Sequence, residues 1–306
     1  APTKQRSWHL KKKSKKKLKK KKKKTFKQVK KYIKMGGDNN KQYYREDGSL
    51  MKNGERSGNG KLYSKEGTLE YDGEWNDGER SGKGKSFDKD GTIQYDGKWK
   101  KDMYNGEGEY YYDDGTYSGN WINGKEDGQG KLFYKDGTLE YDGEWKKGMK
   151  NGKGKSYRED GSPEYDGKWN DGERSGKGHS FREDGSPEYY GEWVKGMKNG
   201  KGHSYREDRS TEYYGEWVKG MKHGKGNEYL PNGKLLLNGT WDKGGIVTGD
   251  LYYKPMFGST HSNYTLTKYE SIKKNYEAVV AAEAVEAAAK AVKAKAEAAA
   301  VAPVDR

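Results

Sequence analysis

The chain has 306 residues, of which 29% are hydrophobic and 36% are charged, and its formal net charge is +15. It contains no cysteine, which excludes disulfides and thiolate metal sites. No apolar stretch approaches the roughly 18 residues that a membrane span needs, and the N-terminus lacks the apolar core of a secretory signal. We therefore expect an intracellular protein, neither secreted nor transmembrane, in the cytoplasm, the nucleus or an organelle.

The positive charge is concentrated at the N-terminus. Residues 1–34 contain 17 lysines and one arginine but no acidic residue, so their charge is +18 and residues 35–306 sum to −3. A block of like charges repels itself and stays extended unless it meets a polyanion. We expect a disordered or partner-bound basic tail at 1–34, followed by a connector at 35–42.

The tail favours nucleic-acid phosphate, and RNA in the first place, as its partner. Lysine is a point charge without bidentate readout of bases, so we expect tight, salt-dependent binding with little sequence preference. The predicted nucleic-acid-binding residues are the lysines of the block at 11–24, namely Lys11, Lys12, Lys13, Lys15, Lys16, Lys17, Lys19, Lys20, Lys21, Lys22, Lys23 and Lys24.

Other interpretations of the tail stay open. Phe26, Val29 and Ile33 would lie on one side of a short basic helix, as in an anchor to an anionic membrane. Acidic protein surfaces such as tubulin tails would attract the same lysines. A nuclear-localisation signal and a merely solubilising tail also fit the composition.

Eight tryptophans recur at a nearly constant spacing after the connector. Successive positions are 24 residues apart, except for one step of 22. Seven of the eight close the motif Tyr-x-Gly-x-Trp, and a short fixed period of this kind predicts a repeat architecture. The predicted structural core of the repeats is the column Trp75, Trp99, Trp121, Trp145, Trp169, Trp193, Trp217 and Trp241.

Each repeat is predicted to form two short antiparallel strands. In the first, Tyr71, Gly73 and Trp75 alternate with polar residues and so share one face. Asp-Gly turns separate the strands. A Gly-x-Gly pair, such as Gly82 and Gly84, falls in the second strand, where we expect a neighbouring aromatic ring to lie over the bare backbone.

Two repeats depart from the pattern. Arg209 stands where the turn glycine is expected, so we predict a less regular hairpin there. The repeat that ends at Trp121 lacks two residues before its tyrosine motif.

The pattern Tyr-x-Gly-Glu-Trp, followed by Gly-x-x-x-Gly-x-Gly and an aromatic residue, resembles the MORN repeat (membrane occupation and recognition nexus) over roughly residues 43–250. The copies are slightly longer than the usual period of that family. The resemblance implies an all-β repeat ribbon, that is, a MORN β-hairpin solenoid. We expect it to extend over residues 43–257. The resemblance also favours a role at membranes, through phosphoinositides, or in the cytoskeleton, because MORN proteins occur in these places.

Residues 258–306 are predicted to form a polar link and an Ala-rich α-helix. Thr267 and Glu270 fit a capping box, and an apolar stripe at helical spacing follows. We expect the first half of the helix to cap the last hairpins and the second half to project or to contact a partner.

The sequence favours no enzyme, cofactor or metal. The Gly-x-Gly pairs lack the following helix of a phosphate loop. His179 and His203, one repeat apart, would lie about 9–10 Å from each other, too far to share a metal. Near-identical copies indicate that no repeat is specialised.

We therefore predict a non-enzymatic scaffold whose ribbon is a spacer or a docking surface for other proteins. Its tail would bind RNA or DNA, for example in a large ribonucleoprotein assembly. The alternative is a scaffold at the membrane periphery or in cilia and the cytoskeleton.

Overall fold

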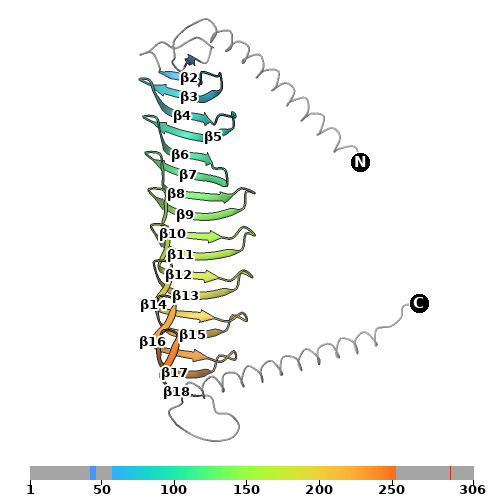
Figure 1. Ribbon diagram of the computed structural model, residues 1–306, viewed down its shortest axis with the longest axis vertical. Helices are drawn as coiled ribbons and strands as arrows, with labels where there is room; N and C mark the ends of the chain where they lie inside the picture. Colours follow the sequence, from blue (N-terminus) through green and yellow to red (C-terminus); the bar gives the residue numbers. More distant parts are fainter. Residues whose placement is uncertain (1–41, 46–56, 253–289, 291–306) are drawn as a thin grey trace, which may run out of the picture. The chain divides into compact units, whose positions relative to one another are not determined.

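The computed structural model describes residues 42–45, 57–252 and 290, and the described residues between 42 and 251 form antiparallel strands (Figure 1). The chain forms two compact units. Unit 1 ends at Glu173 and also takes in Glu183–Gly185, and unit 2 comprises Arg174–Arg182 and the chain from Ser186 onwards. The structure therefore confirms the predicted all-β hairpin architecture over the part of the chain that it describes.

Unit 1 is an open sheet in which each strand pairs with the strand before and the strand after it. Its strands are β1 (Gln42–Arg45), β2 (Gly58–Tyr63), β3 (Leu69–Asn76), β4 (Glu79–Phe87), β5 (Ile93–Lys100), β6 (Met103–Tyr111), β7 (Gly115–Ile122), β8 (Lys125–Tyr134), β9 (Leu139–Lys146), β10 (Met149–Tyr157) and β11 (Pro163–Asn170).

Unit 2 repeats the same succession of antiparallel neighbours. Its strands are β12 (Glu173–Phe181), which begins at the boundary of the unit, β13 (Pro187–Val194), β14 (Met197–Tyr205), β15 (Thr211–Val218), β16 (Met221–Tyr229), β17 (Leu235–Asp242) and β18 (Gly245–Leu251).

Two kinds of turn alternate along the sheet. After each tryptophan a two-residue turn reverses the chain, as at Asp77 and Gly78, whose φ angles are 47° and 85°. Positive φ at both central residues is the type I′ geometry, which matches the twist of the flanking strands. The other turn is longer: the amide of Asp88 donates to the carbonyl of Thr92, and the amide of Gly91 donates back to the carbonyl of Asp88. Both turns lie where the sequence predicts them.

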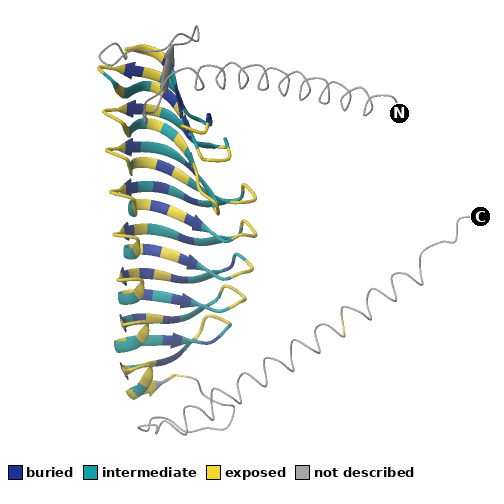
Figure 2. Cartoon of the chain, turned by 45° about the horizontal axis from the view of Figure 1, so that its top comes forward, coloured by how far each residue is buried: buried dark blue, intermediate teal, exposed yellow. Residues whose placement is uncertain are grey.

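The aromatic residues of the motif form the core. Tyr71 is fully buried, and its ring makes edge-on contacts with Trp75 of its own repeat at 5.1 Å and with Trp99 of the next repeat at 5.2 Å. The Trp75 indole N–H donates to the carbonyl of Gly60 at 3.2 Å. Each repeat therefore contributes an aromatic ring to its neighbour, and buried and exposed residues alternate along the strands (Figure 2).

The glycine pairs make room for the tyrosine ring, as predicted. Gly73 on β3 lies opposite Gly84 on β4, and a Cβ atom at Gly84 would lie closer than 3.0 Å to the hydroxyl, Cζ and Cε2 atoms of Tyr71. The Tyr71 hydroxyl passes over the glycines and donates to the carbonyl of Glu74 at 2.9 Å. Burial raises the pKa of Tyr71, so the phenol stays protonated and keeps this hydrogen bond.

The expectation of an irregular hairpin at Arg209 is wrong. Its amide donates to the carbonyl of Arg206 at 3.0 Å, just as the amide of Gly161 donates to the carbonyl of Arg158 at 2.9 Å in an equivalent turn. Arg209 keeps this bond by adopting φ 68°, a conformation that favours glycine. The hydrogen bonds of the turn thus override the preference of a single residue.

The shorter repeat has a local explanation. In other repeats the pairing register shifts at the strand end, as between Ser86 and Phe87. Between β6 and β7 the register runs without a shift up to the pair Tyr111 and Thr116. The loss of two residues therefore shortens the loop and removes the bulge. The tyrosine motif keeps the same pairing with the preceding strand as in the other repeats.

Among the described residues, β1 begins at Gln42 and β18 ends at Leu251, and the bounds 43–257 of the repeat region stay a prediction. The predicted tail at 1–34, the connector up to residue 41 and the residues from 253 to the end lie outside the described residues, apart from Lys290, which is helical. Across the part of the chain that the structure describes, no helix has the length and apolar character needed to cross a membrane.

Replacing Gly84 with Ala should destabilise the fold by about 3 kcal/mol, at the upper end of the usual cost of overpacking, because the buried Tyr71 ring has no room to move. Gly78→Ala is the matched control. A Cβ atom at residue 78 would point into open space. Only the left-handed φ should then lower the free energy of unfolding, by about 1 kcal/mol. Urea unfolding followed by near-UV circular dichroism measures both, and equal losses would contradict the role of the ring.

Arg209→Gly should stabilise unit 2 by about 0.5–1 kcal/mol, since glycine adopts positive φ without steric cost while the arginine is exposed. The converse change, Gly161→Arg, should destabilise unit 1 by a similar amount. Hydrogen exchange of the two turns provides the measurement. A loss of protection in Arg209→Gly would show that the arginine side chain holds the turn.

Candidate interaction surface

The tryptophans named from the sequence lie in the core. All eight are between 2% and 8% exposed. Their indoles are occupied by neighbouring tyrosines, so they are structural and offer no open aromatic site. The predicted tail lysines lie outside the described residues.

A cation covers the tyrosine and tryptophan rings in most repeats. The Arg80 guanidinium lies 4.3 Å from the ring centre of Trp99, and Lys222 lies 4.8 Å from that of Tyr213. Such contacts are worth about 0.5–2 kcal/mol, depending on exposure. In one repeat Tyr104 takes the place of the cation and stacks on Tyr95 at 4.0 Å. In these repeats the rings are closed off from this side as well.

Four of the covering cations are held by a carboxylate, namely Arg80, Lys150, Lys198 and Lys222. In unit 2, Lys198 lies 5.2 Å from the ring centre of Tyr189, and its Nζ donates to Glu188 at 2.8 Å. The Ser180 hydroxyl donates to the other oxygen of Glu188 at 2.8 Å. Burial raises the pKa of Glu188, but the hydrogen bond and charge of Lys198, together with Ser180 and Arg182, outweigh it and lower that pKa.

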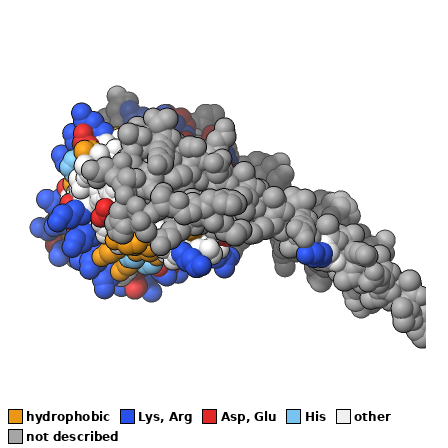
Figure 3. Space-filling model, turned by 90° about the horizontal axis from the view of Figure 1, so that it is seen from below, with side chains coloured by type: hydrophobic (Ala, Val, Ile, Leu, Met, Phe, Trp, Pro, Cys, Tyr) orange, Lys and Arg blue, Asp and Glu red, His pale blue; other side chains and the backbone are white. Residues whose placement is uncertain are grey.

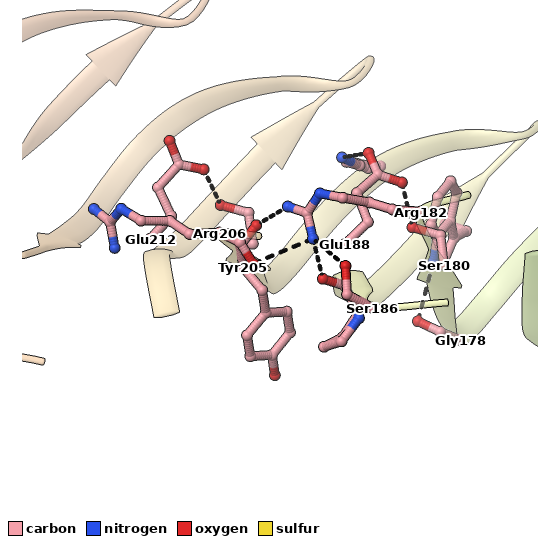
Figure 4. Close-up of polar contacts among 12 residues, drawn as sticks. Gly178, Ser180, Arg182, Ser186, Glu188, Tyr205, Arg206 and Glu212 are labelled. Atoms are coloured by element: carbon pink, nitrogen blue, oxygen red, sulfur yellow. Dashed lines mark hydrogen bonds and ion pairs between the residues drawn. The ribbon is translucent and has the colours of Figure 1, made fainter. Parts of the chain in front are cut away.

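Arginines tie consecutive long turns together in unit 2 (Figure 4). The Arg182 guanidinium donates to the carbonyls of Pro187 and Tyr205, to the carbonyl of Arg206 at 3.3 Å and to the Ser186 hydroxyl at 3.4 Å. One side chain thus satisfies backbone acceptors in its own repeat and in the next. Arg206 repeats this arrangement with Ser210, Thr211 and Tyr229.

The outer face is the side of the sheet opposite the aromatic core. In unit 1, one row of this face is an ionic ladder across the strands. Lys61 pairs with Asp72 and Lys85 pairs with Asp96, while Lys131 lies 3.1 Å from Asp142 and Lys155 lies 2.9 Å from Asp166. Exposed ion pairs of this kind add little stability, about 0–1 kcal/mol each.

In unit 2 the same row is aromatic. His179 lies opposite Tyr190 in the register of β12 and β13, and their rings stack at 4.1 Å. His203 lies opposite Tyr214, and their rings stack at 4.2 Å. Tyr190 and Tyr214 are 36% and 38% exposed, whereas the residues that precede them, Tyr189 and Tyr213, face the core and are fully buried. We call His179, Tyr190, His203 and Tyr214 the aromatic ladder.

Two of the two-residue turns of unit 2 carry an exposed apolar pair. Val194 faces Met197 and Val218 faces Met221 across these turns, and all four side chains are exposed. The equivalent pair after Trp75 consists of Asn76 and Glu79. Figure 3 shows hydrophobic and histidine side chains adjoining one another on the surface among lysines and arginines.

The described residues contain no group of three or more His, Cys, Asp or Glu side chains that could hold a metal ion. His179 and His203 are each engaged in ring stacking rather than aimed at one another.

Comparison with protein families decides the family of the chain. A model of the MORN repeat matches eight segments, which together cover more than half of the chain: residues 51–69, 71–93, 95–116, 117–139, 141–162, 165–186, 189–211 and 213–234. The chain belongs to the MORN repeat family. A search of curated proteins found none that matches it.

The MORN repeats correspond to the hairpins described above. The second matched segment begins at Tyr71 and ends at Ile93, so it takes in most of β3, the tight turn, β4 and the long turn. The last two begin at Tyr189 and Tyr213, which precede the exposed Tyr190 and Tyr214. The aromatic ladder is therefore a property of the C-terminal MORN repeats.

These repeats differ from the others on the outer face, and the expectation that no repeat is specialised for a function stays a prediction. The signal was present in the sequence, where Tyr-Tyr-Gly-Glu-Trp replaces Tyr-Asp-Gly-Glu-Trp at 189–193 and 213–217. Taken alone, the second tyrosine looks like a variable exposed position. Only the strand register shows that Tyr190 meets a histidine on each neighbouring strand, and that Tyr214 meets His203 on one side and Asn227 on the other.

The stability of these MORN repeats should fall as the pH drops below about 4.5, the ordinary pKa of Glu188. Because the folded state lowers that pKa, the unfolded state binds more protons in this window, and the stabilisation is lost as pH falls through the folded value. Glu188→Gln should therefore show a shallower acid-side decline than the parent protein in urea unfolding at several pH values. A decline as steep in Glu188→Gln as in the parent protein would contradict this assignment.

Proposed function

We propose that this MORN protein is a non-enzymatic scaffold whose repeats present a docking surface and whose basic tail attaches it to RNA. The observation that carries the scaffold role is the division of labour within each strand. The first Tyr and the Trp of each motif are buried in the core, while the opposite face of the sheet carries a periodic row of ionic or aromatic side chains. A periodic, open surface suits an extended partner better than a small substrate.

The charge distribution supports the second half of the proposal. Residues 1–34 carry +18 while the remainder of the chain sums to −3, so attraction to a polyanion resides in the tail. Each phosphate that a lysine neutralises releases a counterion, which favours binding at low salt. A large ribonucleoprotein assembly is a setting in which such a tail would hold the scaffold in place.

The test uses the full chain with all twelve lysines between Lys11 and Lys24 changed to Gln. Affinity for a poly(U) RNA should fall at least about tenfold at moderate salt. The slope of log K against log salt should shrink by about 0.7 for each phosphate that the variant no longer neutralises. Fluorescence anisotropy at several salt concentrations measures both quantities.

The matched control changes four exposed lysines of the repeats, Lys83, Lys153, Lys177 and Lys201, to Gln. It should leave RNA binding nearly unchanged. Unaltered RNA affinity in the tail variant would overturn the assignment of the tail to RNA.

A membrane-periphery or cytoskeletal scaffold is the second candidate, favoured by the apolar side that Phe26, Val29 and Ile33 would form in a helix. Flotation with anionic vesicles, with and without competing RNA, separates the two. Flotation that RNA does not reduce would favour the membrane. Binding to an acidic tubulin-tail peptide in place of both would favour the cytoskeleton.

A further inference from the structure

The aromatic ladder of unit 2 is the surface feature that neither the core nor the tail explains. Its four residues occupy one row across β12 to β15 and are directly opposite one another in the strand register. Asn227 is the next member of the row, and it bonds to Asn238 at 2.8 Å rather than to a ring. The aromatic part of the row is therefore bounded and spans about 14 Å, three strand spacings.

The ladder has a period of its own. One His–Tyr pair follows the other after two strands, a distance of about 9.6 Å. A polyproline II helix has three residues per turn and rises 3.1 Å per residue, which gives a period of about 9.3 Å. A peptide in this conformation that runs across the strands would therefore bring every third residue onto an equivalent His–Tyr pair.

The chemistry of the ladder also fits such a peptide. A polyproline II segment exposes apolar rings and backbone carbonyls that have no internal hydrogen bonds. The ladder offers aromatic surface, and its phenol hydroxyls and imidazole N–H groups can donate to those carbonyls. Burial lowers the pKa of His203, so that imidazole is neutral at pH 7 and remains an apolar ring with one donor.

The neighbouring row argues against nucleic acid at this place. Lys177 lies opposite Glu192, and Lys201 lies opposite Glu216, so positive and negative charges alternate beside the ladder. Such a row gives no net attraction for phosphate, whereas a proline-rich peptide needs none. Proline-rich segments dock in aromatic-lined grooves of other protein modules, and the ladder supplies aromatic side chains of this kind.

We propose that His179, Tyr190, His203 and Tyr214 form a docking site for proline-rich segments in the polyproline II conformation. This inference rests on the proposed scaffold function and names the class of partner that its docking surface takes. The minimal ligand is about five residues long with two prolines three positions apart, one over each His–Tyr pair.

The test measures binding of a labelled decaproline peptide to the full-length protein by fluorescence anisotropy, with a Gly-Ser decapeptide as the negative control. The matched variant carries His179→Lys, Tyr190→Asp, His203→Lys and Tyr214→Asp. It installs in unit 2 the ionic ladder that unit 1 already carries at Lys61, Asp72, Lys85 and Asp96, so the strand pairing should tolerate it. Decaproline affinity should fall at least about tenfold in the variant.

The converse variant guards against loss of folding as an explanation. Lys61→His, Asp72→Tyr, Lys85→His and Asp96→Tyr should build a second ladder in unit 1 and raise the stoichiometry of decaproline from one to two. Among short peptides, prolines at positions i and i+3 should bind better than prolines at i and i+2.

Equal decaproline binding by the parent and the ionic-ladder variant would overturn the proposal, as would no binding at all. Poly(U) binding that disappears in the ionic-ladder variant would assign the ladder to nucleic acid instead. Poly(U) binding retained by that variant, together with weakened decaproline binding, is the expected result. The RNA assignment of the tail is tested separately, because it predicts that poly(U) binding is lost only in the tail variant.

Discussion

The ring of Tyr71 reaches its buried place because neither Gly73 nor Gly84 carries a side chain. Because the two paired glycines lack side chains, they leave a gap on the core face of the sheet, and the phenol ring fills it. The hydroxyl at the far end of the ring donates a hydrogen bond to the backbone of its own strand. The gap is useful only if something covers the other side of the ring, and Trp99 of the next repeat does so. The contact therefore links neighbouring repeats as well as strands within a repeat.

The low hydrophobic content of the chain follows from this packing. A core built mainly of one tyrosine and one tryptophan per repeat lets most outward-facing strand positions be polar. Cations such as Lys198, paired with Glu188, cover the rings where a second layer would otherwise be needed. Because the outer face contributes little to stability, its side chains can change without loss of the fold. The ionic ladder of unit 1 and the aromatic ladder of unit 2 are two sets of side chains that the same backbone arrangement accommodates.

Much of the repeat could be predicted because its determinants are local. The alternation of Tyr71, Gly73 and Trp75 places three residues on one face, and Asp77-Gly78 supplies the tight turn. The prediction failed at Arg209, where the preference of one residue for negative φ gave way to the hydrogen bonds of the turn. Predictions for the tail and for the C-terminal segment concern parts of the chain that the described residues do not include.

The sequence by itself determined the period, the hairpins and the aromatic core, because spacing and turn chemistry act within a few residues. Only the tertiary structure decided which side chains meet across strands. His179 and Tyr190 are brought together through a bulge and a long turn, and Arg182 bonds to the carbonyl of Tyr205 in the following repeat. Contacts of this kind depend on pairing register, and a bulge of one residue is enough to change the register while leaving the sequence pattern the same.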